Sequence, residues 1–350
     1  MDMELFGGCN YKCQMCPQGE PGREREFKKS LTWENFVKIV DDAISHGVES
    51  ISIHGGGEPT LHKRFIDCIK YIKDMGAKCT SISNGYLLND ALNQKIADSG
   101  LDTLRLSVVG YNAETYFKWM KKDAFHQVRE NVKKLVELCK GTNTSVEAQH
   151  LILNMDEKEY EIEQYQKNWV DYTNTKSEIW MMHNWSGEYD SPYERRKENR
   201  RSCGRPFSPM LQVRAGGLDG HQGAVVACCM VLGNDKAATL GHLDTQTIED
   251  VMNGDKYEEL RLAHTEGRFD DISYCKDCDQ LYDVPESLVW TNMNNRVYNQ
   301  SKVLDDLRII LTYSIQNILG HIFTVLSMRV STVTSMILGK QMRVKRNGTN

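Results

Sequence analysis

Proline is scarce in this chain of 350 residues, with only seven, and the chain carries no excess of positive charge. Lysine and arginine number 43 against 48 aspartates and glutamates, which gives a formal net charge of −5. A basic surface normally attracts a nucleic acid backbone, so we expect no nucleic acid partner. The first eight residues include two acids and lack the apolar core of a secretory signal. The sequence therefore predicts a cytoplasmic protein without a disulfide framework.

Cysteine, by contrast, is abundant, with 11 residues in a chain whose apolar and charged fractions are those of an ordinary globular protein. Clustered thiols outside an oxidising compartment serve metal ions, iron–sulfur clusters or redox exchange. At roughly 150 residues per domain, the length allows two to three folding units. The positions of the cysteines are therefore the best guide to function.

Short apolar strands alternate with amphipathic helical segments from residue 1 to about residue 190. The helical segments place apolar residues at helical spacing, as in the stretch that begins after Thr32 and stops at Gly47. Repeated βα units form a parallel sheet, and the six units counted here are two fewer than in a closed eight-fold barrel. The sequence predicts an α/β fold with a partial (β/α)6 TIM-like barrel over residues 1–190. Its strands are expected near residues 4–6, 51–53, 80–83, 103–109, 146–153 and 178–182.

The chain beyond this barrel divides into two further regions. Residues 203–285 contain a glycine-rich hairpin, with strands near 211–214 and 224–228, and a helix over 247–262, which predicts a small α+β domain. Residues 286–350 carry a long apolar stripe, which predicts a helical C-terminal extension. Polar residues within the stripe argue against a membrane span and favour packing or oligomerisation. The basic end of the extension leaves contact with an anionic membrane surface as the alternative.

Three cysteines directly follow the first expected strand, in the pattern C-x3-C-x2-C formed by Cys9, Cys13 and Cys16. Three thiolates this close in sequence can hold three corners of a cubane iron–sulfur cluster and leave the fourth iron open for a ligand. A zinc site completed by a distant ligand and simple reactive thiols are the alternatives. The spacing lacks the paired C-x2-C knuckles usual for zinc, which favours the iron–sulfur cluster.

This motif at the head of a six-unit βα chain resembles the radical S-adenosylmethionine (SAM) superfamily, and the resemblance covers nearly all of residues 1–285. One departure is Met15, where the family usually places an aromatic residue. The resemblance implies a [4Fe–4S] cluster held by Cys9, Cys13 and Cys16, with SAM bound at its open iron. It also implies that an external electron donor such as flavodoxin or ferredoxin drives cleavage of SAM. The resulting 5′-deoxyadenosyl radical would abstract a hydrogen atom from the substrate.

Further motifs follow the next three expected strands. A Gly-Gly-Gly-Glu stretch comes after the second strand, where glycines let a backbone approach a ligand closely and a carboxylate suits an ammonium group. This stretch resembles the family's GGE motif, which implies contact with the amino group of SAM. A Ser-Asn-Gly turn after the third strand and a serine near the end of the fourth imply contacts with the SAM carboxylate and ribose. The SAM-binding residues predicted in this way are Gly55, Gly56, Gly57, Glu58, Asn84 and Ser107.

A second group of cysteines, Cys203, Cys228, Cys275 and Cys278, lies in the α+β region. Their spacing and the residues between them resemble the auxiliary-cluster extension called SPASM, or its shorter form, twitch. Because no cysteine follows Cys278, the resemblance implies one fully ligated auxiliary [4Fe–4S] cluster. Cys229 competes for the fourth ligand position, although the spacing from the preceding glycine favours Cys228. A zinc ribbon with four thiolate ligands is the alternative.

The substrate is less clearly encoded than the cofactors. An auxiliary cluster that accepts an electron from a substrate radical implies a two-electron oxidation, so we expect an oxidoreductase. Family members with one auxiliary cluster include aminocyclitol dehydrogenases, and only eight residues precede Cys9, so we expect no fused peptide-recognition domain. We therefore expect a small polar metabolite of sugar or cyclitol type as substrate.

The alternative substrate is a ribosomally made peptide, and a less favoured reading is a non-catalytic electron carrier. His183, Asn184 and Trp185 at the end of the sixth strand, and His54 beside the glycine stretch, are candidates for substrate contact. The sequence singles out no catalytic side chain.

Overall fold

The computed structural model describes residues 1–20, 28–190, 200–208, 210–232, 235–282 and 288–293. These residues all belong to one compact unit, Met1–Tyr298. Most of the extension expected over residues 286–350 lies outside the described residues, and so does its proposed membrane contact. The domain boundaries at residues 190, 203 and 285 stay predictions.

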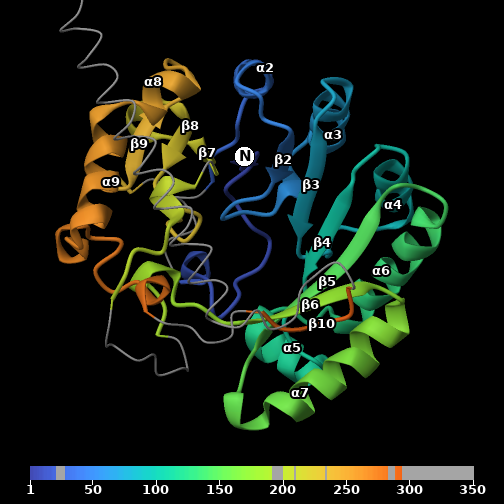
Figure 1. Ribbon diagram of the computed structural model, residues 1–350. Coiled ribbons are helices and arrows are strands. Elements are labelled where there is room, and N and C mark those ends of the chain that lie inside the picture. Colours follow the sequence, from blue (N-terminus) through green and yellow to red (C-terminus); the bar gives the residue numbers. More distant parts are fainter. Residues whose placement is uncertain (21–27, 191–199, 209, 233–234, 283–287, 294–350) are drawn as a thin grey trace, which may run out of the picture. The chain divides into compact units, whose positions relative to one another are not determined.

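A ten-stranded sheet organises the described residues, with strand order β10-β6-β5-β4-β3-β2-β1-β7-β8-β9 (Figure 1). In chain order, the first six strands (β1 to β6) pair in parallel with their neighbours, and helices make the crossovers between them. This arrangement confirms the predicted α/β fold and its partial barrel. The six strands are β1 (Asp2–Met3), β2 (Ser50–Ile53), β3 (Lys78–Ser83), β4 (Thr103–Ser107), β5 (Ser145–Ile152) and β6 (Lys176–Met181).

The helices pack apolar residues against the sheet, and three of the six barrel helices begin at a residue whose side chain caps the first turn. The Thr32 side chain accepts a hydrogen bond of 3.3 Å from the Asn35 N–H, which satisfies an otherwise unpaired donor at the start of α2, as the sequence predicts. Figure 1 shows α3, α4 and α6 along the strands of the barrel. The barrel helices are α2 (Trp33–Ser45), α3 (Phe65–Asp74), α4 (Asp90–Ala97), α5 (Ala113–Met120), α6 (Phe125–Cys139) and α7 (Lys158–Tyr165), which continues as a π-helix over Gln166–Asp171.

The predicted hairpin of the second region extends the same sheet. β7 (Gln212–Gly216) pairs in parallel with β1, and β8 (Gln222–Val226) and β9 (Thr239–His242) follow it antiparallel. Two helices, α8 (Ile248–Met252) and α9 (Asp255–Glu266), complete this part. The short strand β1 therefore connects the barrel to the auxiliary region, because it pairs with β2 on one side and β7 on the other.

Three details differ from the sequence-based expectation. The first strand comprises residues 2–3 instead of 4–6, because the chain turns after Glu4 toward the site described below. The helix expected over 247–262 is two helices, since Gly254 adopts an extended conformation between them. β10 (Leu288–Thr291) lies at the start of the region expected to be helical and pairs antiparallel with β6.

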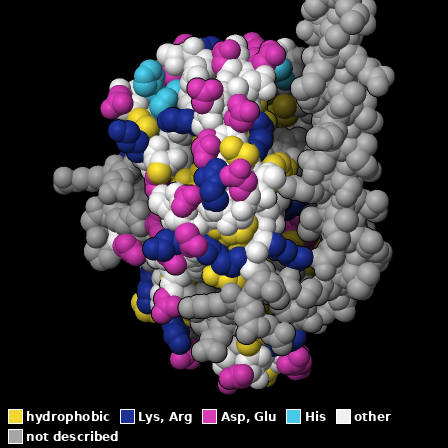
Figure 2. All heavy atoms as spheres, turned by 60° about the vertical axis from the view of Figure 1, so that its left-hand side comes forward, with side chains coloured by type: hydrophobic (Ala, Val, Ile, Leu, Met, Phe, Trp, Pro, Cys, Tyr) yellow, Lys and Arg dark blue, Asp and Glu magenta, His cyan; other side chains and the backbone are white. Residues whose placement is uncertain are grey.

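Figure 2 shows acidic and basic side chains interspersed over one face of the molecule, with hydrophobic atoms scattered between them. Within the described ranges, none of the helices combines the length and the apolar character needed to cross a membrane.

We expect Asn112→Ala to lower the free energy of unfolding by about 1 kcal/mol, because Asn112 caps α5. Its Oδ1 accepts from the Thr115 N–H at 2.8 Å, and the Thr115 hydroxyl accepts from the Asn112 N–H at 3.1 Å. Urea unfolding measures the change. Gln94→Ala, on the exposed face of α4, is the matched control and should change stability by only a few tenths of a kcal/mol. Equal effects of both substitutions would contradict the capping role.

Candidate SAM and iron–sulfur cluster sites

Loops that follow the first four strands converge on a cavity of about 330 Å³. The carboxyl ends of parallel strands share one edge of the sheet, which is where α/β folds build their sites. The volume lies within the usual range of small-molecule sites. The lining includes every residue predicted to contact SAM, namely Gly55, Gly56, Gly57, Glu58, Asn84 and Ser107, together with the cysteines Cys9, Cys13 and Cys16.

The glycine stretch packs directly against the chain that leads into the cysteine loop. A Cβ atom on Gly57 would lie 2.1 Å from the Phe6 carbonyl oxygen and 2.6 Å from that of Gly8, so only glycine fits. The Glu58 N–H donates to the Gly8 oxygen at 2.9 Å. The Gln18 side-chain amide donates to carbonyl oxygens of both loops. Close contact between two loops, in addition to approach to a ligand, therefore accounts for this motif.

Glu4 is a site residue that the sequence analysis missed. Its Oε2 accepts a hydrogen bond of 2.6 Å from the Gly56 N–H, and its Oε1 accepts one of 3.2 Å from the Ala215 N–H. The carboxylate thus joins the glycine stretch to β7 of the auxiliary region. A lone acid at the end of a two-residue strand gives no sequence signal of this role.

Glu58 is buried, at 2% exposure, and its carboxylate has four protein donors. Oε1 accepts from the Thr60 N–H and hydroxyl and from the Ser83 hydroxyl, and Oε2 accepts from the Asn84 N–H at 2.7 Å. Burial raises the pKa of this carboxyl, and the hydrogen bonds oppose that shift. A carboxylate accepts about four hydrogen bonds, so its main task is to join the ends of β2 and β3. Oε2 retains one acceptor position toward the cavity.

Asn84 connects the third strand to the cysteine loop. Its Nδ2 donates to Asn10 Oδ1 at 2.7 Å and lies 3.8 Å from Cys9 Sγ. Ser107, at the end of β4, lines the cavity as well. The Ser-Asn-Gly turn and Ser107 therefore lie beside the cysteine loop and the glycine stretch.

The first three cysteines fit a cluster that supplies positive charge. Burial raises the pKa of the Cys9 thiol to about 12 and that of Cys13 well above its usual value, and the neighbouring Cys16 raises both further. Without a cation, these buried thiols favour their neutral form. Bound iron offsets the cost of the thiolates, so this donor set suits a site that binds metal as it deprotonates.

The second cysteine group lines a separate cavity. Cys203, Cys228, Cys275 and Cys278 all border it. Burial raises the pKa of the Cys278 thiol to about 12. His264 lies 3.5 Å from Cys275 Sγ through Nε2, and burial lowers its pKa to about 4, so this imidazole is neutral near pH 7. Four thiols around one cavity fit a fully ligated cluster.

Cys228 and Cys229 face different cavities. Cys228 lines the cavity of the second cysteine group, whereas Cys229 lines the cavity of the first. Cys229 Sγ contacts the guanidinium of Arg205. A bend at Ala227 and a turn that includes Cys229 and Met230 lie on either side of Cys228. The geometry therefore favours Cys228 as the fourth member of the second group.

A single metal ion fits neither group well. No set of three or more His, Cys, Asp and Glu side chains in the described part of the chain is arranged to hold one ion. Tetrahedral zinc brings its sulfur ligands within roughly 3.8 Å of one another. A cubane binds each thiolate to a different iron atom and therefore needs a wider spread of sulfurs.

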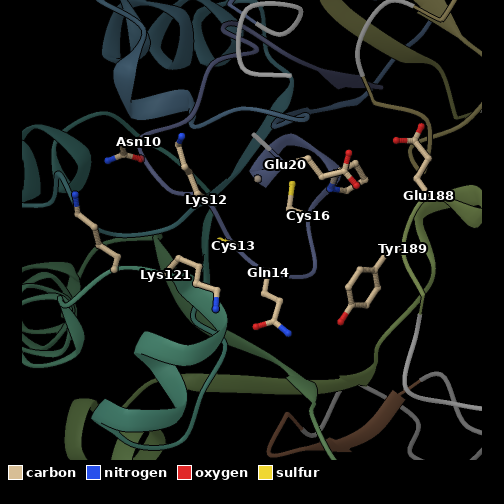
Figure 3. Close-up of a pocket in the computed structure, with 12 residues that line it drawn as sticks. Asn10, Lys12, Cys13, Gln14, Cys16, Glu20, Lys121, Glu188 and Tyr189 are labelled. Atoms are coloured by element: carbon tan, nitrogen blue, oxygen red, sulfur yellow. The ribbon is translucent and has the colours of Figure 1, made fainter. Parts of the chain in front are cut away.

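The first cysteine group also borders a more open hollow of about 530 Å³ on another side of its loop (Figure 3). Cys13 and Cys16 line this hollow and also the cavity of about 330 Å³ at the strand ends, which we call the candidate SAM cavity. Lys12, Lys121 and Lys122 stand around the hollow, with Glu188 among them. The cluster position is therefore accessible from two directions.

Comparison with known families agrees with this geometry. Residues 3–159 match the model of the Radical SAM superfamily, and residues 220–279 match that of SPASM, an iron–sulfur cluster-binding domain. The fold and the site define a protein of the radical SAM class. The chain belongs to the radical SAM superfamily and carries a SPASM auxiliary-cluster domain. Its cofactors are a [4Fe–4S] cluster, an auxiliary cluster and SAM.

Similar proteins differ in what they act on. A probable GTP 3′,8-cyclase of Methanococcus maripaludis is 32% identical over 130 residues, which cover 37% of this chain and 43% of that protein. The chain thus spans less than half the length of such curated relatives. BtrN in complex with AdoMet and 2-DOIA has a TM-score of 0.54 at 17% identity, over 79% of this chain and 91% of BtrN. Streptococcus suis SuiB bound to the precursor peptide SuiA has a TM-score of 0.56 at 15% identity, over 74% and 66%. These two likenesses show the fold alone.

Three of the four residues predicted to contact the substrate line the candidate SAM cavity. His54, His183 and Trp185 line it, but Asn184 is not among its lining residues. The Asn184 N–H instead donates to Asp279 Oδ2 at 2.7 Å, which fastens the end of β6 to the loop of the last two cysteines. Further lining residues that the sequence analysis did not single out include Gln149, His150, Trp180 and Arg214.

We expect Gly57→Ala to abolish assembly of the first cluster, because the added methyl group would overlap the carbonyl oxygen of Phe6. Iron analysis after anaerobic reconstitution measures the loss. Gly56→Ala is the matched control, since the nearest atoms to its added Cβ lie 3.4 Å away. If both variants retained full iron content, close packing of these loops would not be required.

We expect Cys228→Ser to lower the iron content from about eight to about four atoms per chain, because it removes one ligand of the auxiliary cluster. Cys229→Ser should retain about eight, since its thiol lines the other cavity. Iron and sulfide analysis of both variants measures the difference. The reverse result would assign Cys229 as the ligand.

Proposed function

We propose that this protein is a radical SAM oxidoreductase that oxidises a small polar metabolite of sugar or cyclitol type by two electrons. When bound, the first cluster and SAM supply a 5′-deoxyadenosyl radical, which takes a hydrogen atom from the substrate. In this proposal Cys9, Cys13 and Cys16 hold that cluster. Cys203, Cys228, Cys275 and Cys278 hold the auxiliary one.

The chain's own residues would bind and orient SAM beside the first cysteine group. The free acceptor position of Glu58 Oε2 suits one N–H of the SAM amino group. Asn84 and Ser107 line the same cavity and offer polar contacts to the carboxylate and ribose. Because Glu58 and Gln18 fix the two loops against each other, these groups would need little rearrangement on binding.

The observation that carries the proposal is the pair of adjoining cavities, each bordered by its own cysteine group. Cys228 and Cys229 border one cavity each, so consecutive residues of the chain line the two cavities. A substrate in the first cavity would lie beside both groups, which suits removal of a hydrogen atom followed by transfer of an electron to the auxiliary cluster.

The size of the cavity supports a small substrate. Its volume of about 330 Å³ has to hold SAM as well as the reacting part of the substrate. The fold shared with BtrN in complex with AdoMet and 2-DOIA is compatible with a small molecule, and the fold shared with SuiB bound to a precursor peptide keeps the peptide maturase as the alternative.

We infer that an external donor such as flavodoxin or ferredoxin would reach the first cluster through the hollow shown in Figure 3. Cys13 and Cys16 border this hollow, and Lys12, Lys121 and Lys122 stand around it. Glu20 and Glu188 border the hollow too, so the three lysines leave a small excess of positive charge, which favours an acidic protein partner. The donor would then not need to pass the substrate cavity.

We expect the anaerobically reconstituted protein, reduced with dithionite, to release 5′-deoxyadenosine from SAM. Cys16→Ser should abolish the release because it removes a proposed cluster ligand. Cys139→Ser, a buried cysteine at the end of α6, is the matched control and should retain it. Chromatography of the quenched reaction measures the product. A wild-type protein with full iron content and no 5′-deoxyadenosine would contradict the proposal, and faster release with short peptides but not with polyols would favour the maturase.

A further inference from the structure

Arg214 on β7 is a buried cation on the wall of the candidate SAM cavity, with only 3% of its surface exposed. Its Nη2 donates to the carbonyl oxygens of Val231 at 2.6 Å and Cys229 at 3.2 Å. Its Nε has no acceptor among the described residues. Its Nη1 comes no closer than 3.9 Å to Glu4 Oε2. Among the described residues, the Nε–H and the two N–H groups of Nη1 therefore have no acceptor at hydrogen-bond distance.

Glu4 offsets the charge of Arg214 only in part. Its two oxygens already accept from the backbone N–H groups of Gly56 and Ala215, at 2.6 and 3.2 Å. A buried charge is costly unless it is both paired and hydrogen-bonded. The arrangement is therefore incomplete as a purely structural ion pair, and an acceptor group in the cavity would complete it.

Trp185 supplies another unpaired donor on the same cavity. Its Nε1 is buried and finds no hydrogen-bond partner within the part of the chain that the structure describes. Trp185 and Ser186 both adopt left-handed backbone conformations, with φ of 48° and 59°. Such residues persist when their surroundings hold them, and here the bonds between Asn184 and Asp279 fasten the turn. The indole is thus held on the cavity wall by a strained turn.

We propose that Arg214 and Trp185 bind an oxyanion of the substrate, so that the small polar metabolite carries a carboxylate or a phosphate group. This inference rests on the proposed function and names its substrate class more closely. A guanidinium is the side chain best suited to such oxyanions, and charge-assisted hydrogen bonds are the strong ones. The carboxylate of SAM is the other oxyanion that these two donors could bind. However, Arg214 and Trp185 lie outside the loops after β2, β3 and β4 that carry the predicted SAM contacts.

Calorimetric titration of the reconstituted, SAM-loaded protein without reductant tests the inference. The probes are D-glucose 6-phosphate, D-glucuronate and neutral D-glucose. We expect at least one charged sugar to bind about tenfold more tightly than glucose or better. Arg214→Gln should remove this preference. Trp185→Phe keeps an aromatic ring and removes the N–H, so it should weaken binding of the charged sugar roughly tenfold.

Arg105→Gln is the matched control, because Arg105 also lies on a sheet strand and pairs with a glutamate, Glu147, at 3.1 Å, but does not line the cavity. It should keep the preference for charged sugars. Iron content checks that Arg214→Gln leaves the auxiliary cluster in place, since Arg214 also holds the backbone at Cys229 and Val231. If that variant loses iron, Trp185→Phe alone decides the outcome.

Equal binding of charged and neutral sugars would overturn the inference, and so would a preference that survives both substitutions. Titration with SAM and with decarboxylated SAM separates the two oxyanion sources. If Arg214→Gln weakened binding of SAM but not binding of its decarboxylated analogue, the arginine would belong to the cofactor site instead. Because no reductant is present, the binding result stands even if the wild-type protein releases no 5′-deoxyadenosine, which would contradict only the proposed function.

Discussion

The contact between the glycine stretch and the chain before the first cysteine is the constraint on which both sites depend. At Gly57 the two backbones approach so closely that no side chain fits between them. Gln18 and Glu58 fasten the same pair of loops by hydrogen bonds. Backbones packed this closely are hardly compressible, so the two loops cannot move independently of each other. The distance between a cluster on the cysteine loop and a ligand on the glycine stretch is therefore fixed before either binds.

β1 has the same importance for the relation between the two cysteine groups. It is only two residues long, yet it pairs with β2 and with β7. Glu4, the next residue, bonds to the glycine stretch on one side and to Ala215 on the other. Adjacent strands of a sheet lie about 4.8 Å apart, so this pairing brings the hairpin that ends at Cys228 next to the barrel. Two regions that are distant in sequence thereby line one cavity.

The sequence was sufficient to predict the elements with strong local signals. Helical spacing and caps such as Thr32 predict the barrel helices, and the position of each motif after a strand predicts the shared edge of the sheet. It could not predict how buried polar groups find partners, because such pairings depend on long-range contacts. Glu58 illustrates the difference: its motif indicates a ligand contact, whereas most of its hydrogen bonds go to Thr60, Ser83 and Asn84. Glu4 and Arg214 have no local motif at all.

The distribution of donors around the cavity sorts the ligands that can enter it. Near the glycine stretch the polar groups are largely paired with one another, so this wall is rigid and offers few free positions. Toward β7 and the end of β6, the Arg214 Nε–H and the Trp185 Nε1–H have no acceptor among the described residues. Unpaired donors penalise an apolar occupant, since it would leave them unsatisfied, and favour one with oxygen acceptors. Selection against apolar molecules would therefore follow from the donors on β7 and after β6.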